Sequence, residues 1–159
     1  MGLNMVVVKN GEELINFRIG YLAFNRLRRE IANAIDPELG RLYQRSFDND
    51  MALGMGKHKL TDVELVALIA EQVEIPAKMQ SLKSIERIGK LYPSGCDAAL
   101  FDFLWHSDCD GTIPWPTARR LWYILHKLKL EEEWLQESLE GLKNVMWQSY
   151  YFRRMVEFI

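Results

Sequence analysis

The centre of the chain reads, from residue 106 to residue 113, His106-Ser107-Asp108-Cys109-Asp110-Gly111-Thr112-Ile113. What such an acidic string can do depends on whether a strand or a helix precedes it. The preceding residues, 96 to 105, place apolar side chains at helical spacing, and residues 118 to 128 repeat this pattern after the string. The stretch therefore predicts a loop between two helices.

Two further helices are predicted on the N-terminal side of this loop. Residues 21 to 35 alternate apolar and charged side chains with helical periodicity until Asp36-Pro37 ends the run. Pro37 suits a first helical position, and a second amphipathic segment continues to Phe47. Residues 48 to 59, with two glycines among polar side chains and methionines, indicate a surface loop.

A capping box predicts where the next helix begins. In Thr61-Asp62-Val63-Glu64 the Thr and Glu side chains can satisfy free backbone N–H groups, and we expect a buried stripe of Leu65, Leu68 and Ile69. Pro76 is expected to start another helix, which Tyr92-Pro93-Ser94-Gly95 ends.

The two ends of the chain carry different patterns. Residues 131 to 159 predict one long helix with an acidic first turn. Near the N-terminus, Met5 to Val8 is β-branched and apolar, whereas residues 12 to 18 could equally form a turn of helix. The fold class expected from these patterns is all-α or nearly so: a compact helical domain with a central EF-hand-like helix-loop-helix and room for a short N-terminal strand.

Composition limits the classes of protein. The chain has 159 residues and 48% apolar content, enough for one domain with a core, and we expect a single helical domain over residues 1–159. Twenty basic and twenty-two acidic residues give a net charge of −2, so no overall field attracts nucleic acid. Because Met1 to Val8 lacks the features of a signal peptide and no apolar run is long enough for a membrane span, we expect a cytoplasmic protein without membrane contact.

One interpretation of the central loop is an EF-hand-like calcium site. With Gly111 at the glycine position of the calcium loop, Asp108, Asp110 and the Thr112 carbonyl fall on ligand positions. His106 and Thr117 replace the first carboxylate and the bidentate glutamate of that loop, so the site keeps only two carboxylates. The candidate metal ligands are therefore Asp108, Asp110 and Thr112, and calcium is the candidate ion.

Two other interpretations of the loop remain. Asp108-x-Asp110-Gly111-Thr112 matches the aspartate-based phosphotransfer signature, which needs a buried parallel strand in front of it. Alternatively the loop is purely structural: Asp and Ser cap turns, Gly111 accepts a positive φ, and Ile113 and Trp115 anchor it on the core. We favour the structural interpretation.

Two weaker patterns of possible binding residues also occur in the chain. His106 and Cys109, with Cys96 and His126, contain zinc-type ligands but lack the paired spacing of structural zinc sites. Five arginines make the first third of the chain locally basic, which suggests nucleic-acid binding less than a solvated helix face: Arg26, Arg28, Arg29, Arg41 and Arg45.

The chain resembles a group of small uncharacterised bacterial proteins that carry an HSDCDG motif. The resemblance rests on Met1-Gly2-Leu3, on Phe24-Asn25-Arg26-Leu27-Arg28 and on residues 106 to 111. It implies a bacterial, intracellular origin and a compact domain, and it implies no activity and no functional residues.

The leading functional hypothesis is a non-catalytic cytoplasmic protein that binds another macromolecule, most simply another protein. It is motivated by a well-supplied core without a coherent catalytic set of nucleophile, base and oxyanion donors. The alternatives are a calcium-responsive module and, ranked last, a phosphotransfer enzyme.

Overall fold

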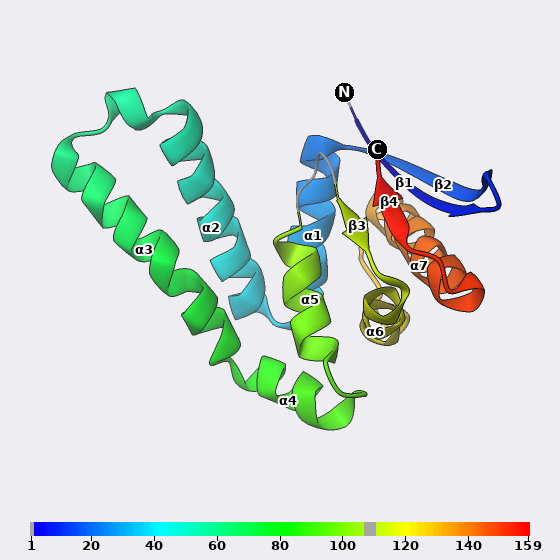
Figure 1. The fold of residues 1–159 in the computed structure, drawn as a ribbon. Helices are drawn as coiled ribbons and strands as arrows, with labels where there is room; N and C mark the ends of the chain where they lie inside the picture. Colours follow the sequence, from blue (N-terminus) through cyan, green and yellow to red (C-terminus); the bar gives the residue numbers. More distant parts are fainter. Residues whose placement is uncertain (1, 107–110) are drawn as a thin grey trace.

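The computed structural model describes residues 2–106 and 111–159 (Figure 1). The described chain is mostly helical, as the sequence predicts, and also contains a small sheet. Its elements are, in order, β1 (Gly2–Lys9), β2 (Glu12–Gly20), α1 (Tyr21–Ile35), α2 (Pro37–Met55), a 3₁₀ turn η1 (Lys57–Lys59), α3 (Asp62–Gln80), α4 (Lys83–Leu91), α5 (Cys96–Leu104), β3 (Thr112–Ile113), α6 (Trp115–Leu125), α7 (Glu133–Phe152) and β4 (Val156–Phe158).

The sheet is the main departure from the predicted all-α fold. Its described strands lie in the order β2-β1-β4-β3, and every neighbouring pair is antiparallel. Asn10 and Gly11 have φ values of 56° and 82°, which a two-residue hairpin turn requires and which Asn-Gly adopts at low cost. The short strand expected at Met5 to Val8 is therefore half of a hairpin, and residues 12 to 18 form its second strand and not a helical turn.

The C-terminal segment completes the sheet. The predicted long helix ends at Phe152, where Arg153 takes a left-handed conformation with a φ of 51°. The chain then turns back, and β4 pairs with β1 and β3, so that Val156 lies opposite both Val7 and Ile113. All three side chains are buried, so these three paired strands cover one side of the core.

The helices form a body and an arm. α7 packs on β1, β2 and α6, and α5 packs on α6, which together make the body (Figure 1). α2 lies against α1 and carries α3 on its other side, and this antiparallel helix pair is called the α2–α3 arm. Among the described elements, α3 makes substantial contact with α2 and with α4, which follows it in the chain.

Two predictions in the arm are wrong at their boundaries. Residues 48 to 55 were predicted as a loop, but they are helical and belong to α2, which continues to Met55. Asn49 in this stretch is buried. Pro76 lies inside α3 and not at the start of a helix, so α3 continues to Gln80 without the backbone hydrogen bond that a proline cannot donate. The capping box is confirmed, with Glu64 N donating to Thr61 Oγ1 at 3.2 Å and Thr61 N donating to Glu64 at 2.8 Å.

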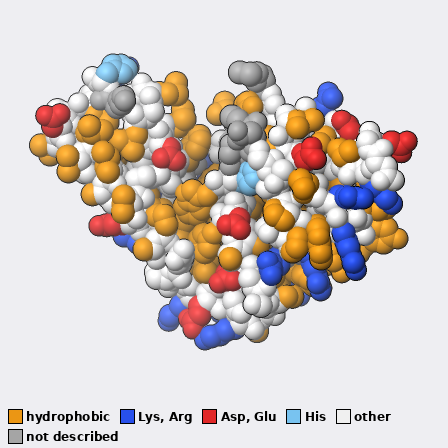
Figure 2. Space-filling model, in the orientation of Figure 1, with side chains coloured by type: hydrophobic (Ala, Val, Ile, Leu, Met, Phe, Trp, Pro, Cys, Tyr) orange, Lys and Arg blue, Asp and Glu red, His pale blue; other side chains and the backbone are white. Residues whose placement is uncertain are grey.

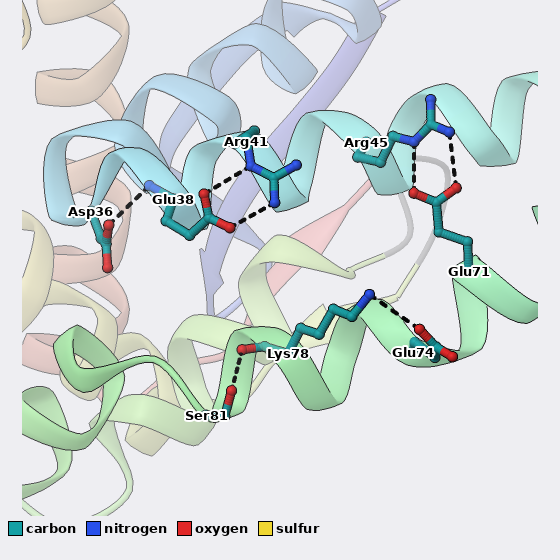
Figure 3. Close-up of polar contacts among 8 residues, drawn as sticks. All are labelled: Asp36, Glu38, Arg41, Arg45, Glu71, Glu74, Lys78 and Ser81. Carbon is teal, nitrogen blue, oxygen red and sulfur yellow. Dashed lines mark hydrogen bonds and ion pairs between the residues drawn. The ribbon is translucent and has the colours of Figure 1, made fainter.

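Polar contacts hold the two helices of the arm together. Arg45 donates from two guanidinium nitrogens to Glu71, at 2.8 and 2.9 Å (Figure 3). Gln72 donates to Ser46 Oγ at 2.9 Å and to Asp50 at 2.8 Å. The predicted apolar stripe is less buried than expected, because Leu65 and Leu68 are half-buried and Ile69 is 48% exposed.

Gly40 sets the close approach of α1 and α2. A Cβ at this position would lie 1.7 Å from Asn33 Oδ1 and 3.0 Å from Asn33 Cα. We expect Gly40→Ala to lower the free energy of unfolding by about 1–3 kcal/mol in urea denaturation. Gly54→Ala in the same helix meets no atom within 4 Å and should raise it by about 0.5 kcal/mol. Equal stability of the two variants would contradict the close packing.

The Arg45–Glu71 pair predicts an acid sensitivity of the arm. Hydrogen bonds from Arg45 hold the pKa of Glu71 below its usual range, against a smaller opposing effect of burial. A carboxylate with a lowered pKa stabilises the fold above its unfolded pKa, near 4.3, and this contribution is lost as the pH falls through the folded value. Unfolding curves between neutral and acid pH should therefore show a smaller acid loss of stability for Glu71→Gln than for the wild type. Glu137→Gln, at an exposed position of α7, should behave as wild type.

Candidate functional site: the cleft between α3 and α5

A cleft of 560 Å³ lies between the C-terminal half of α3 and the body, and it is called the α3–α5 cleft. Figure 2 shows hydrophobic side chains on both sides of the hollow between the arm and the body. The volume is within the range of ordinary ligand pockets. The lining residues are Pro76 and Gln80 from α3, Phe101, Asp102, Trp105 and His106 at the end of α5, and Thr112, Ile113, Pro114 and Thr117 around β3.

The sequence of α5 explains the apolar wall of the cleft. Its buried side chains, among them Phe103 and Leu104, pack into the core. Phe101 and Trp105 are four residues apart and thus share another face, with ring centroids 5.9 Å apart. Trp105 remains 40% exposed, so α5 carries apolar side chains toward both the core and the cleft.

Arg28 fixes the end of α5 to α1. This side chain is buried, and it donates a 2.8 Å hydrogen bond to the carbonyl oxygen of His106. Its guanidinium lies 4.1 Å from the ring centroid of Phe24 and 5.6 Å from that of Phe103. Stacking on aromatic rings and charge-assisted hydrogen bonding are what make a buried arginine tolerable.

His106 joins the same wall to the sheet. Its ring stacks on Phe158 of β4 with centroids 4.1 Å apart, and its Nε2 lies 3.3 Å from the carbonyl oxygen of Thr112. Phe158 N donates to the carbonyl of Gly111 at 3.1 Å. The two ends of the central loop are therefore held together by α1, α5 and β4.

A second, smaller cavity lies on the other side of this wall. It has a volume of 250 Å³ and is lined mainly by α1 and α2, with Trp105 and His106 shared between the two cavities. Its polar side chains are connected, because Tyr43 Oη donates to Asn25 Oδ1 at 3.0 Å and Asn25 Nδ2 donates to the Tyr21 carbonyl at 3.2 Å. The wall thus separates two cavities, and the smaller one contains this chain of connected polar side chains.

The predicted metal ligands are only partly placed. Asp108 and Asp110 lie outside the described residues, and Thr112 is an exposed residue of β3 whose carbonyl faces the His106 ring. Within residues 2–106 and 111–159, no group of three or more His, Cys, Asp or Glu side chains could hold a metal ion. Calcium binding stays a prediction. Two of the structural expectations for the loop are confirmed, because Gly111 has a φ of 110° and Ile113 is buried. Trp115 is half-buried, and the expected turn caps at Ser107, Asp108 and Asp110 lie outside the described residues.

The structure shows the surroundings of the phosphotransfer-like string, of Cys96 and of the arginines. A helix, α5, and not a strand precedes the phosphotransfer-like string, and the described strand pairs are antiparallel. Cys96 is buried, and this burial raises the pKa of its thiol. Among the described residues, Arg26 pairs with Glu132, Arg29 with Glu30, Arg41 with Glu38 and Arg45 with Glu71.

The cleft itself was not predicted from the sequence. One signal pointed to it: residues 62 to 80 carry apolar side chains all around the helix, which is unusual for a helix that covers a core with one face only. The partner wall could not be read, because Phe101 and Trp105 look like ordinary core positions until their orientation in α5 is known.

Arg28 should be more sensitive to substitution than the other arginines. Arg28→Lys removes the planar stacking on Phe24 and Phe103, and we expect it to lower the free energy of unfolding by about 1.5–3 kcal/mol. Arg41→Lys, at an exposed position of α2, should change it by less than about 0.5 kcal/mol. Denaturant unfolding of both variants tests the difference, and similar losses would show that Arg28 does not hold α5.

Comparison with known protein families, with curated proteins and with solved structures found no significant match to this chain. Across the described helices, none combines the length and the apolar composition that crossing a membrane requires. The geometry of the α3–α5 cleft is therefore the basis for a functional proposal.

Proposed function

We propose that the protein is a binding domain that takes up an apolar segment of another protein in the α3–α5 cleft. The observation that carries this proposal is the half-exposed Trp105 beside Phe101, facing Pro76 across an open apolar cleft. Large aromatic side chains at the centre of such clefts supply most of the binding free energy in protein interfaces.

The shape of the cleft favours a polypeptide segment over a compact small molecule. The cleft opens along α3, where Ile69, two turns before Pro76, is exposed on the same face of the helix. An elongated ligand could continue its apolar contacts along this helix. Recognition of an apolar helix face or strand in a groove is a common mode of peptide binding.

The charge of the cleft indicates which kind of protein segment it would bind. Among the described residues that line it, Asp102 is the carboxylate, and neither lysine nor arginine is present. Asp102 is exposed at the rim, where it could pair with a basic side chain. The preferred segment therefore combines two or three apolar side chains with a lysine or arginine.

Selection of short random peptides on the immobilised protein tests this proposal. We expect the enriched peptides to be apolar with a basic residue, and Trp105→Ala to weaken their affinity, measured by calorimetry, at least about tenfold. Asp102→Asn should weaken binding mainly at low ionic strength, because a rim charge is screened by salt.

The matched control is Trp134→Ala on α7. Trp134 is 37% exposed, close to the 40% of Trp105, but it does not line the cleft. This variant should bind the peptides as the wild type does. Failure to enrich any peptide, or equal affinity of the wild type and Trp105→Ala, would reject the cleft as a binding site.

A further inference from the structure

The outward face of α3 carries a row of exposed apolar side chains that α2 does not cover. The members of this row, called the α3 stripe, are Val63, Val66, Ala70, Val73 and Ala77. Their exposed fractions reach 79% at Val63, 66% at Val66 and 74% at Val73. Exposed rows of β-branched aliphatic side chains are characteristic of interaction surfaces.

The spacing of the α3 stripe is that of a helix-pairing seam. Positions 63, 70 and 77 are seven residues apart, and Val66 and Val73 lie between them, which is the a/d pattern of two packed helices. α2 occupies a different face of α3, where Ile75 and Met79 are buried. Pro76 and Gln80 are the α3 residues of the cleft, so the stripe is a separate surface.

The stripe is complementary to itself when two copies run antiparallel. A two-fold axis at Ala70 would place Ala70 beside its own copy and Val63 opposite Ala77, and it would bring Val66 opposite Glu74, the residue that follows Val73. The alanines allow the two helix backbones to approach closely. Because α3 has 19 residues, this seam would be about 28 Å long.

Charge selects the antiparallel orientation. The first turn of α3 is acidic, with Asp62 and Glu64, whereas its last turn carries Lys78, which pairs with Glu74 at 3.1 Å, and Lys83 begins α4. An antiparallel pair brings acidic ends next to basic ends and opposes the two helix dipoles. A parallel pair would place like charges side by side.

We propose that a second copy of this chain covers the α3 stripe, by antiparallel packing of α3 on α3. The helices of the two α2–α3 arms then lie in one row, in the order α2, α3, α3 and α2, with the α3 pair at its centre. One helix pair buries less area than a standard interface, so we expect a dissociation constant of roughly 1–100 µM.

Sedimentation velocity over a wide concentration range measures this association. The wild type should pass from monomer to dimer, whereas Val66→Glu and Val73→Glu should remain monomeric, because each places a carboxylate in the seam. Leu22→Glu is the control, since Leu22 is 78% exposed on α1, outside the stripe, and this variant should dimerise as the wild type does. A wild type that stays monomeric at millimolar concentration, or a dimer that Val66→Glu leaves intact, would overturn the proposal.

Cysteine cross-linking tests the orientation. With Cys109 replaced by Ser, we expect Ala70→Cys to form a disulfide-linked dimer on mild oxidation, and Val63→Cys to link to an Ala77→Cys partner in a mixture of the two. Efficient linking of Val63→Cys to itself would instead show a parallel pair and overturn the antiparallel arrangement. Peptide binding in the cleft should persist in Val66→Glu, so this proposal and the proposed function can fail independently.

Discussion

The body of the protein depends on the contacts of the buried Arg28 guanidinium. It lies against Phe24 and Phe103 and donates to the His106 carbonyl, so it ties α1 to the end of α5. His106 extends the connection to β4 by stacking on Phe158. A buried cation is costly without such partners, and here its hydrogen bond to His106 holds the chain segment that follows the last residue of α5.

The two helices of the α2–α3 arm are held together mainly by polar contacts, unlike the elements of the body. α2 is attached to α1 through a close approach at Gly40. α3 contacts α2 through the Arg45–Glu71 ion pair and the hydrogen bonds of the Gln72 side chain, and its buried residues are Ile75 and Met79. Exposed ion pairs contribute little to stability. The arm therefore keeps much of the apolar surface of α3 open, and both proposed interactions use that surface, one toward the body and one away from it.

Local signals in the sequence located most helices, but they did not predict which neighbouring elements cover the apolar faces of these helices. The capping box at Thr61 and the break at residues 92 to 95 are short-range features, and both are found in the structure. The continuation of α2 through residues 48 to 55 was missed because its polar side chains resemble a loop when the neighbouring helix is unknown. Ile69 was expected to be buried because periodicity identifies an apolar face but not the number of neighbours that cover it.

The sequence by itself determined a mostly helical chain and the positive φ at Gly111, since both follow from forces within a few residues. The turn at Asn10-Gly11 is equally local, but the hairpin was not predicted, because residues 12 to 18 fitted a turn of helix as well as a strand. Only the tertiary structure decided that β4 joins β1, that Arg28 is buried and that Trp105 faces a cleft. These features bring together residues that are distant in sequence, such as Val7 and Val156. Such pairings depend on how whole elements pack, which the periodicity of a single segment does not encode.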